Sequence, residues 1–233
     1  MRELPPPLPP ETRTVGQLVA ETIRTYGASF WWSLPLGLPL AIADQLSVRH
    51  ASPVQMVVYW AATPLFVAAF VRACARVLDA QPTAAAVGVA VLVYLPFPAL
   101  RAFYILPGLA WFALMGLAVP AAMVERTSFR DALVRGRQLG VADYVHALGS
   151  LAALVIVVGL AGNTLSALLH TQGDNGQRLA VFLSDLVLSP LLFLGGALLY
   201  VDQAARAVRS RHAALHPPVD ADAAGRADPQ VES

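Results

Sequence analysis

Apolar residues occur along this chain in long runs, and the segments between the runs hold most of the charged residues. A helix that rises ~1.5 Å per residue needs about 20 residues to cross the ~30 Å hydrocarbon layer of a bilayer. The pattern therefore predicts an all-α fold, a polytopic transmembrane helix bundle of about six spans. The predicted spans cover residues 30–46, 54–71, 83–97, 102–124, 148–169 and 179–201.

Two segments outside these runs have the periodicity of amphipathic helices. One begins with Thr14-x-x-Gln17, and the other covers residues 125–146 and contains Ser128-x-x-Asp131. Both four-residue patterns have the form of a capping box, in which the first side chain accepts a hydrogen bond from a backbone amide of the first turn. We predict that both helices lie at the membrane surface.

The two amphipathic segments also indicate a probable parallel internal repeat. Residues 14–34 align with residues 128–148 without a gap, at an offset of 114. The matched positions are Val15 with Phe129, Val19 with Leu133, Phe30 with Tyr144, Leu34 with Leu148 and, further on, Thr63-Pro64 with Ser189-Pro190. Four predicted spans lie between the two starts, so both units would enter the membrane from the same side. The alternative is chance similarity between two amphipathic helices that precede spans.

Prolines interrupt three of the predicted spans, at Pro35, Pro39, Pro64 and Pro190. Proline has no amide hydrogen and its ring clashes with the preceding helical turn. We therefore expect breaks there, with the freed carbonyls satisfied inside the bundle. The first run also opens with Trp31-Trp32, and indole rings favour the interface between membrane and water.

Composition and charge support the membrane assignment and predict an orientation. The chain is 57% hydrophobic and 13% charged, with a mean hydropathy of +0.59. Thirteen of the sixteen arginines fall on one side of the predicted topology, and Arg49, Arg101 and Arg178 fall on the other. Because cytoplasmic loops carry the excess of basic residues, we expect both termini in the cytoplasm. The absence of lysine suggests a GC-rich bacterial genome, and hence a bacterial plasma (inner) membrane.

The ends of the chain differ from the apolar middle. Residues 1–12 are proline-rich and predict a disordered N-terminal tail, and residues 212–233 lack apolar periodicity and predict a disordered C-terminal tail. The six-span transmembrane domain would then cover residues 13–211.

Ionisable groups at membrane depth are costly, so each one is a functional hypothesis. Asp185 lies inside the last predicted span and could bind a cation or proton, or contact Asn163 of the preceding span. Asp44 ends the proline-broken first span and could contribute to an ion or solute site. The structural alternatives are a carboxylate near the outer interface, paired with arginine or solvated.

Other charged residues have simpler alternatives beside each functional hypothesis. Arg126, Arg130, Arg135 and Arg137 could contact anionic lipid headgroups, or they could serve only to orient the chain. Asp202 and Arg206, four residues apart, predict an ion pair within one helix.

No pattern in the sequence indicates catalysis. The chain has no G-x-S-x-G, H-E-x-x-H or P-loop sequence. We expect no enzyme activity, no metal site and no cofactor. Nucleic acid is not expected as a partner, because the arginines follow the membrane boundary and the net charge is only +1.

Several short motifs resemble a known bacterial family. They occupy residues 119–133, 138–139, 143–144 and 198–206. This pattern resembles the membrane domain found beside some glycerophosphoryl diester phosphodiesterases and in stand-alone multi-span proteins. The resemblance covers about residues 14–206 and implies the fold. It implies no phosphodiesterase activity, because the chain has no such catalytic domain. Arg135-Gly136-Arg137 departs from the Arg-Ser-Trp that is frequent in the family.

We expect a non-catalytic membrane module that binds a protein partner or lipid. The small residues Ala84, Gly88, Gly159, Gly195 and Gly196 would allow close helix packing or a homo-oligomer. The alternative is a small transporter or channel with a path past Asp185.

Overall fold

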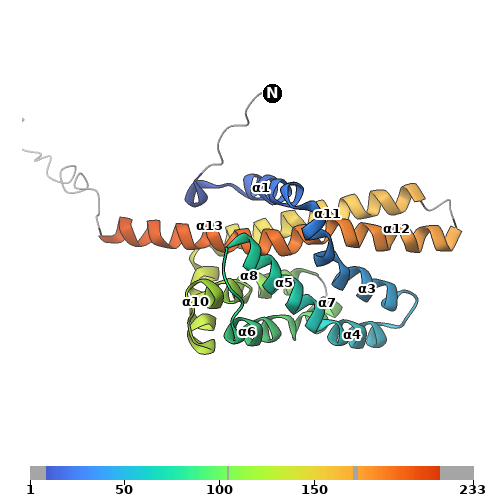
Figure 1. Ribbon diagram of the computed structural model, residues 1–233, viewed down its shortest axis with the longest axis horizontal. Coiled ribbons are helices and arrows are strands. Elements are labelled where there is room, and N and C mark those ends of the chain that lie inside the picture. Colours follow the sequence, from blue (N-terminus) through green and yellow to red (C-terminus); the bar gives the residue numbers. More distant parts are fainter. Residues whose placement is uncertain (1–8, 104, 170–172, 216–233) are drawn as a thin grey trace, which may run out of the picture.

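The computed structural model describes residues 9–103, 105–169 and 173–215. Within these ranges the regular elements are all helices, and no strand occurs (Figure 1). Four helical stretches are long and apolar enough to cross a membrane: Ser52–Val77, Ile105–Val124, Tyr144–Leu165 and Asn175–His212. A further apolar helical stretch, Ala84–Leu100, is shorter. These lengths and compositions indicate a membrane protein.

The helices follow one another with short connections. In chain order they are η1 (Pro10–Thr12), α1 (Val15–Ala28), α2 (Phe30–Ser33), η2 (Leu34–Gly37), α3 (Leu38–Ser47), α4 (Ser52–Ala61), α5 (Thr63–Val77), α6 (Ala84–Tyr94), α7 (Phe97–Phe103), α8 (Ile105–Met115), α9 (Ala118–Val124), α10 (Phe129–Ala142), α11 (Tyr144–Leu169), α12 (Gly173–Leu188) and α13 (Pro190–Leu215). Here η marks a 3-10 helix.

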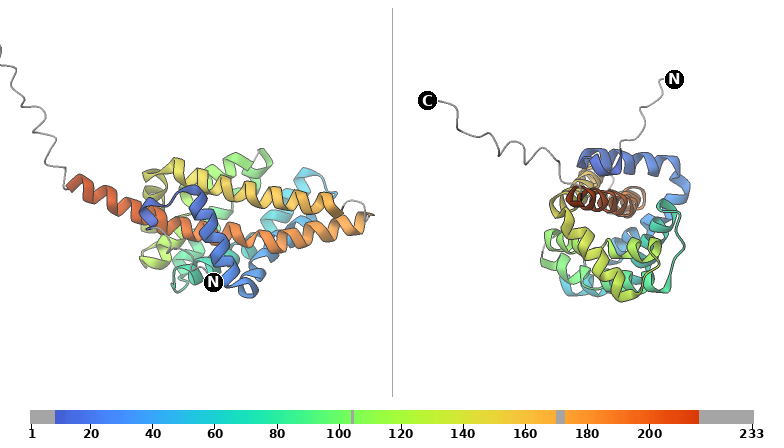
Figure 2. Two further views of the ribbon diagram at one scale, coloured as in Figure 1. Left: turned by 90° about the horizontal axis from the view of Figure 1, so that it is seen from above. Right: turned by 90° about the vertical axis from the view of Figure 1, so that its left-hand side faces the viewer.

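Helices α11, α12 and α13 form the long axis of the molecule. α11 runs beside α12 and α13 in both Figure 1 and Figure 2. α5 packs against α13, and α6 and α9 pack on the far side of α5. The core between them contains Phe70, Val89 and Leu194, all with no more than 1% of their surface exposed. α1 crosses α11 and α13 on the opposite side (Figure 2).

Boundaries between helical elements fall at the prolines singled out from the sequence. The first predicted span is divided into α2, the 3-10 turn η2 and α3, with a proline in the first turn of both η2 and α3. Pro64 lies in the first turn of α5, and Pro190 is the first residue of α13. A missing amide hydrogen costs little in a first turn, because that hydrogen has no partner within the helix.

Some predicted boundaries differ from the structure. The helix α7 occupies the connection expected between the spans 83–97 and 102–124, and α12 begins at Gly173, before the predicted start of the last span at residue 179. α13 continues to Leu215, beyond the predicted end of the domain at residue 211. At the other end, η1 contacts α13, so the folded part begins before residue 13. The remainder of the two predicted tails, residues 1–8 and 216–233, lies outside the described residues.

Helices cover both segments that were predicted to be amphipathic, and both are capped at their first turns. Thr14 and Gln17 form a reciprocal capping box before α1, as predicted. Ser128 accepts a hydrogen bond from the amide of Asp131 at the start of α10. Each helix also buries one face against the bundle. On α10 that face includes Gly136 and Gly140, which lie directly against the backbone of α9 and α8.

Candidate functional site: a cavity inside the helix bundle

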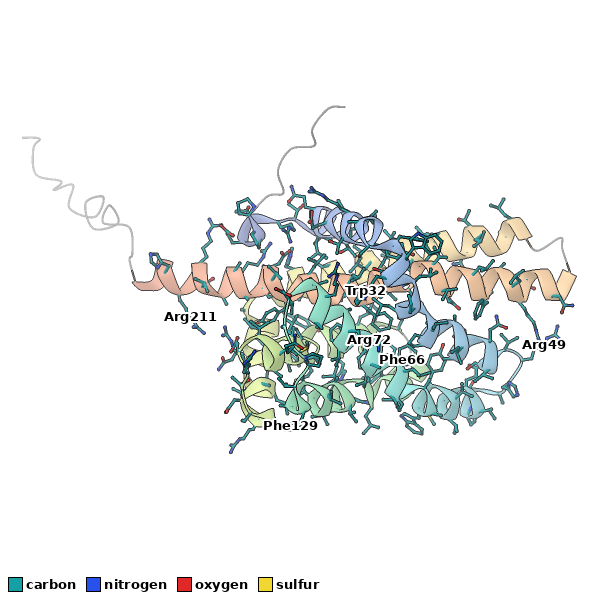
Figure 3. All side chains as sticks on the ribbon, viewed as in Figure 1. Trp32, Arg49, Phe66, Arg72, Phe129 and Arg211 are labelled. Atoms are coloured by element: carbon teal, nitrogen blue, oxygen red, sulfur yellow. The ribbon has the colours of Figure 1, made fainter. Side chains whose placement is uncertain are left out.

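A cavity of about 650 Å³ lies inside the bundle, and its lining residues come from helices α3 to α8 and α11 to α13. Its wall is mostly aliphatic and aromatic. Phe66 stacks on Tyr94 at 6.0 Å between ring centroids, and Phe112 meets Tyr94 edge-on at 5.7 Å. Phe66 is labelled in Figure 3, on the helix α5. These stacked rings form a rigid apolar wall, because each ring limits the rotation of the next.

The three polar residues singled out from the sequence all line this cavity. Asp44 comes from α3, Asn163 from α11 and Asp185 from α12. The sequence suggested a contact between Asp185 and Asn163 and treated Asp44 as a separate hypothesis. The structure places all three around one space.

Asp44 is oriented by its neighbours. The hydroxyl of Tyr59, a residue only 6% exposed, donates a hydrogen bond to the carboxylate of Asp44. The adjacent Gln45 donates from Nε2 to the carbonyl oxygen of Arg178 at 2.8 Å, which joins the end of α3 to α12. Because α3 is held from both sides, Asp44 keeps a defined position at the cavity.

A glycine on α11 leaves open space along that side of the cavity. A Cβ atom added at Gly159 would meet no heavy atom within 4 Å, and Gly159 lines the cavity. The sequence predicts that Gly159 allows close helix packing or a homo-oligomer; it makes no close packing contact within this chain, and the homo-oligomer stays a prediction. The close contact between α11 and α12 is at Gly162 instead, where an added Cβ would lie 2.7 Å from Ser184 Oγ.

This arrangement is suited to binding. Ligand cavities are largely apolar, with a few polar groups that orient the ligand. Two carboxylates and one amide in an apolar wall favour a ligand that combines an apolar body with a cationic or hydrogen-bond-donating group. Among the described residues, no cluster of three or more His, Cys, Asp or Glu could hold a metal ion.

A second polar group of residues lies where α1, α11 and α13 meet, and we call it the polar junction: Arg13, Asp143, Asp202, Gln203 and Arg206. Arg13 pairs with Asp202 at 2.7 Å, and Arg206 pairs with Asp143 at 2.7 Å. Arg206 also donates to the carbonyl oxygen of Arg13 at 2.6 Å. The predicted ion pair between Asp202 and Arg206 was wrong. Asp202 pairs with Arg13, which lies just before α1, and Arg206 pairs with Asp143, which lies just before α11. No spacing or motif in the sequence indicates these partners.

The candidate headgroup arginines of α10 and the residues before it have different surroundings. Arg135 pairs with Glu125 at 2.8 Å and is half-buried. Arg126, Arg130 and Arg137 are exposed. Arg135 is therefore occupied by a structural contact, and the other three present their charge outward.

Comparison with known proteins gives no family assignment. No family model, no curated protein and no solved structure matches this chain significantly.

Proposed function

We propose that this protein is a non-catalytic membrane module that binds a lipid-like small molecule carrying an amine in the cavity beside Asp44 and Asp185. The observation that carries the proposal is the convergence of these two carboxylates and Asn163 on one otherwise apolar cavity. An alkyl chain would lie against the aromatic wall, and an ammonium group would be attracted to the carboxylates. A protein partner would then recognise the loaded module through its exposed helices.

Three dodecyl compounds test this proposal, because they share a chain and differ in their head group. Dodecylamine, dodecanol and dodecanoate are titrated against the full chain in lipid discs, and binding is measured by native mass spectrometry. We expect dodecylamine to bind most tightly. The double variant Asp44→Asn/Asp185→Asn should weaken amine binding by about tenfold or more, since charge-assisted hydrogen bonds are the strong ones.

A bulky side chain in the cavity provides a second measurement. Gly159→Phe should abolish binding of all three compounds, because the open space at Gly159 would be filled. Gly27→Phe is the matched control: Gly27 also has no heavy atom near an added Cβ but lies on α1, away from the cavity. Equal binding of the three compounds, or unchanged binding in Gly159→Phe, would contradict the proposal.

A small transporter is the second candidate, and the helix breaks favour it. The cavity is lined by residues beside each break: Leu40 after η2, Phe66 after the α4–α5 break, and Ser189 between α12 and α13. Broken helices surround the substrate sites of many transporters. If this candidate is right, proteoliposomes should show proton flux with a pH-sensitive dye, and Asp185→Asn should abolish it. Flux no greater than in protein-free liposomes would exclude a proton pathway.

The proposal includes a six-span arrangement in the bacterial plasma membrane, with cytoplasmic termini. The four long apolar stretches are supplemented by Ala84–Leu100 and by the α2–η2–α3 segment, which brings the number of crossings to six. The arginine asymmetry supports the orientation. The resemblance to the phosphodiesterase-associated membrane domain is consistent with this arrangement and remains a prediction.

We also propose that the chain is a parallel duplication. The buried residues of α1 are Leu18, Thr22 and Tyr26, and the offset of 114 maps them onto Ala132, Gly136 and Gly140, which are buried on α10. In each half an apolar segment follows, which is α2–η2–α3 in the first half and α11 in the second, and then an apolar stretch with a boundary at Pro64 or Pro190. Chance similarity between two amphipathic helices would require only a similar order of polar and apolar residues. The two helices also bury matching positions, which supports common ancestry.

A further inference from the structure

A second hollow, separate from the cavity, lies on the outside of the bundle between the α2–η2–α3 segment and α5. Its volume is about 880 Å³. We call it the Trp–Arg groove, after Trp31, Trp32, Arg72 and Arg76, which line one end of it. Trp32 and Arg72 are labelled in Figure 3. None of its lining residues belongs to the cavity described above.

The polarity of the groove changes along its length. Leu65 lies near the start of α5, and Arg72 and Arg76 lie seven and eleven residues further on, or ~10 and ~16 Å along the helix. The opposite wall runs in the other direction, from Trp32 to Ile42, because Trp32 is in contact with Arg76. The groove is therefore basic and aromatic at one end and aliphatic at the other.

The basic end has charge available for an anion. Both arginines are exposed, and Arg76 lies over the Trp32 ring at 5.8 Å. Asp79 also lines the groove, but within the described part of the chain neither arginine forms an ion pair with it or with another carboxylate. The two arginines are four residues apart, so they lie on the same face of α5.

The aliphatic end faces outward. Leu65 is 45% exposed and Ile42 is 37% exposed. In a membrane protein, such side chains contact acyl chains. Trp31 is 82% exposed, and indole rings favour the level of the headgroups. The groove thus extends from headgroup level into the hydrocarbon layer.

We propose that the Trp–Arg groove binds one anionic glycerophospholipid, with its phosphate between Arg72 and Arg76 and an acyl chain along Leu65 and Ile42. Guanidinium groups match phosphate oxygens with paired hydrogen bonds, and Trp32 holds one guanidinium in place. A soluble anion would use the basic end and leave the aliphatic end without a partner. A phospholipid uses both.

Native mass spectrometry of the full chain in detergent, with added phosphatidylglycerol or phosphatidylcholine, tests the site. Wild type should retain phosphatidylglycerol preferentially. Arg72→Gln/Arg76→Gln should lower its retention by about tenfold or more, to the level of phosphatidylcholine. Arg72→Lys/Arg76→Lys, which keeps the charge and loses the paired hydrogen bonds, should be intermediate.

The matched control is Arg209→Gln/Arg211→Gln, which removes two exposed arginines from α13 and leaves the groove intact. It should leave retention unchanged. If both double variants lose phosphatidylglycerol equally, the loss reflects only the total positive charge of the protein, and the proposal is overturned. Full retention of phosphatidylglycerol by Arg72→Gln/Arg76→Gln would also overturn it. Displacement of the lipid by millimolar glycerol phosphate would identify a soluble phosphate as the ligand instead. Circular dichroism should show the same helix content in all variants.

Discussion

Arg13→Ala should lower the free energy of unfolding by about 3–5 kcal/mol, because it leaves the buried carboxylate of Asp202 without its cation. Arg13 is 8% exposed and Asp202 is fully buried, so water cannot replace the missing charge. Arg206 is already bound to Asp143 and to the backbone of Arg13. Thermal unfolding of the full chain in lipid discs, followed by circular dichroism, measures the loss.

A double-mutant cycle separates the ion pair from simple loss of packing. Arg13→Ala/Asp202→Ala should be more stable than the sum of the two single variants predicts, since the double variant leaves no buried unpaired charge. Arg24→Ala is the control: its pair with Glu21 spans 3.9 Å, and the Arg24 side chain is 55% exposed. It should change stability little, as exposed pairs do. Strict additivity in the cycle would show that Arg13 and Asp202 do not interact.

The features that could be predicted from the sequence depend on local chemistry. A proline disturbs its own helix wherever that helix packs, so the breaks at Pro35, Pro39, Pro64 and Pro190 could be located without a structure. The capping box at Thr14 is equally local, because donor and acceptor lie three residues apart. The length of the apolar runs predicted membrane-spanning helices for the same reason.

The features that could not be predicted depend on which helices meet. Asp202 and Arg206 have the spacing of an intrahelical pair, yet each one pairs with a residue brought close only by the packing of α13 against the start of α1 and α11. The gathering of Asp44, Asn163 and Asp185 around one cavity is of the same kind. Each residue could be singled out because a polar side chain at membrane depth is energetically costly. Only the packing of α3, α11 and α12 brings the three residues together.

Gly136 and Gly140 belong to a pattern that the sequence did contain. Their spacing is that of a GxxxG motif, in which two glycines on one helix face let another backbone approach closely. The amphipathic periodicity of the same residues predicts only a helix at the membrane surface. In the structure the glycine face lies against α8 and α9, and Arg130 and Arg137 of the same helix are exposed.

Gly136→Ala should therefore be strongly destabilising, by about 3 kcal/mol, although alanine normally favours a helix. The added Cβ would collide with the backbone nitrogen and Cα of Ala118 on α9, and backbone atoms cannot rotate away as a side chain can. α10 would have to move outward from the bundle. Thermal unfolding in lipid discs measures the effect.

Gly16→Ala on α1 is the matched control, because an added Cβ there meets no heavy atom within 4 Å. It should leave stability unchanged or slightly higher. If Gly136→Ala and Gly16→Ala behave alike, α10 does not dock through its glycine face, and the buried positions that it shares with α1 lose their support for a duplication. If only Gly136→Ala unfolds early, α10 is an integral part of the bundle, and its packing on α8 and α9 fixes the position of its exposed arginines.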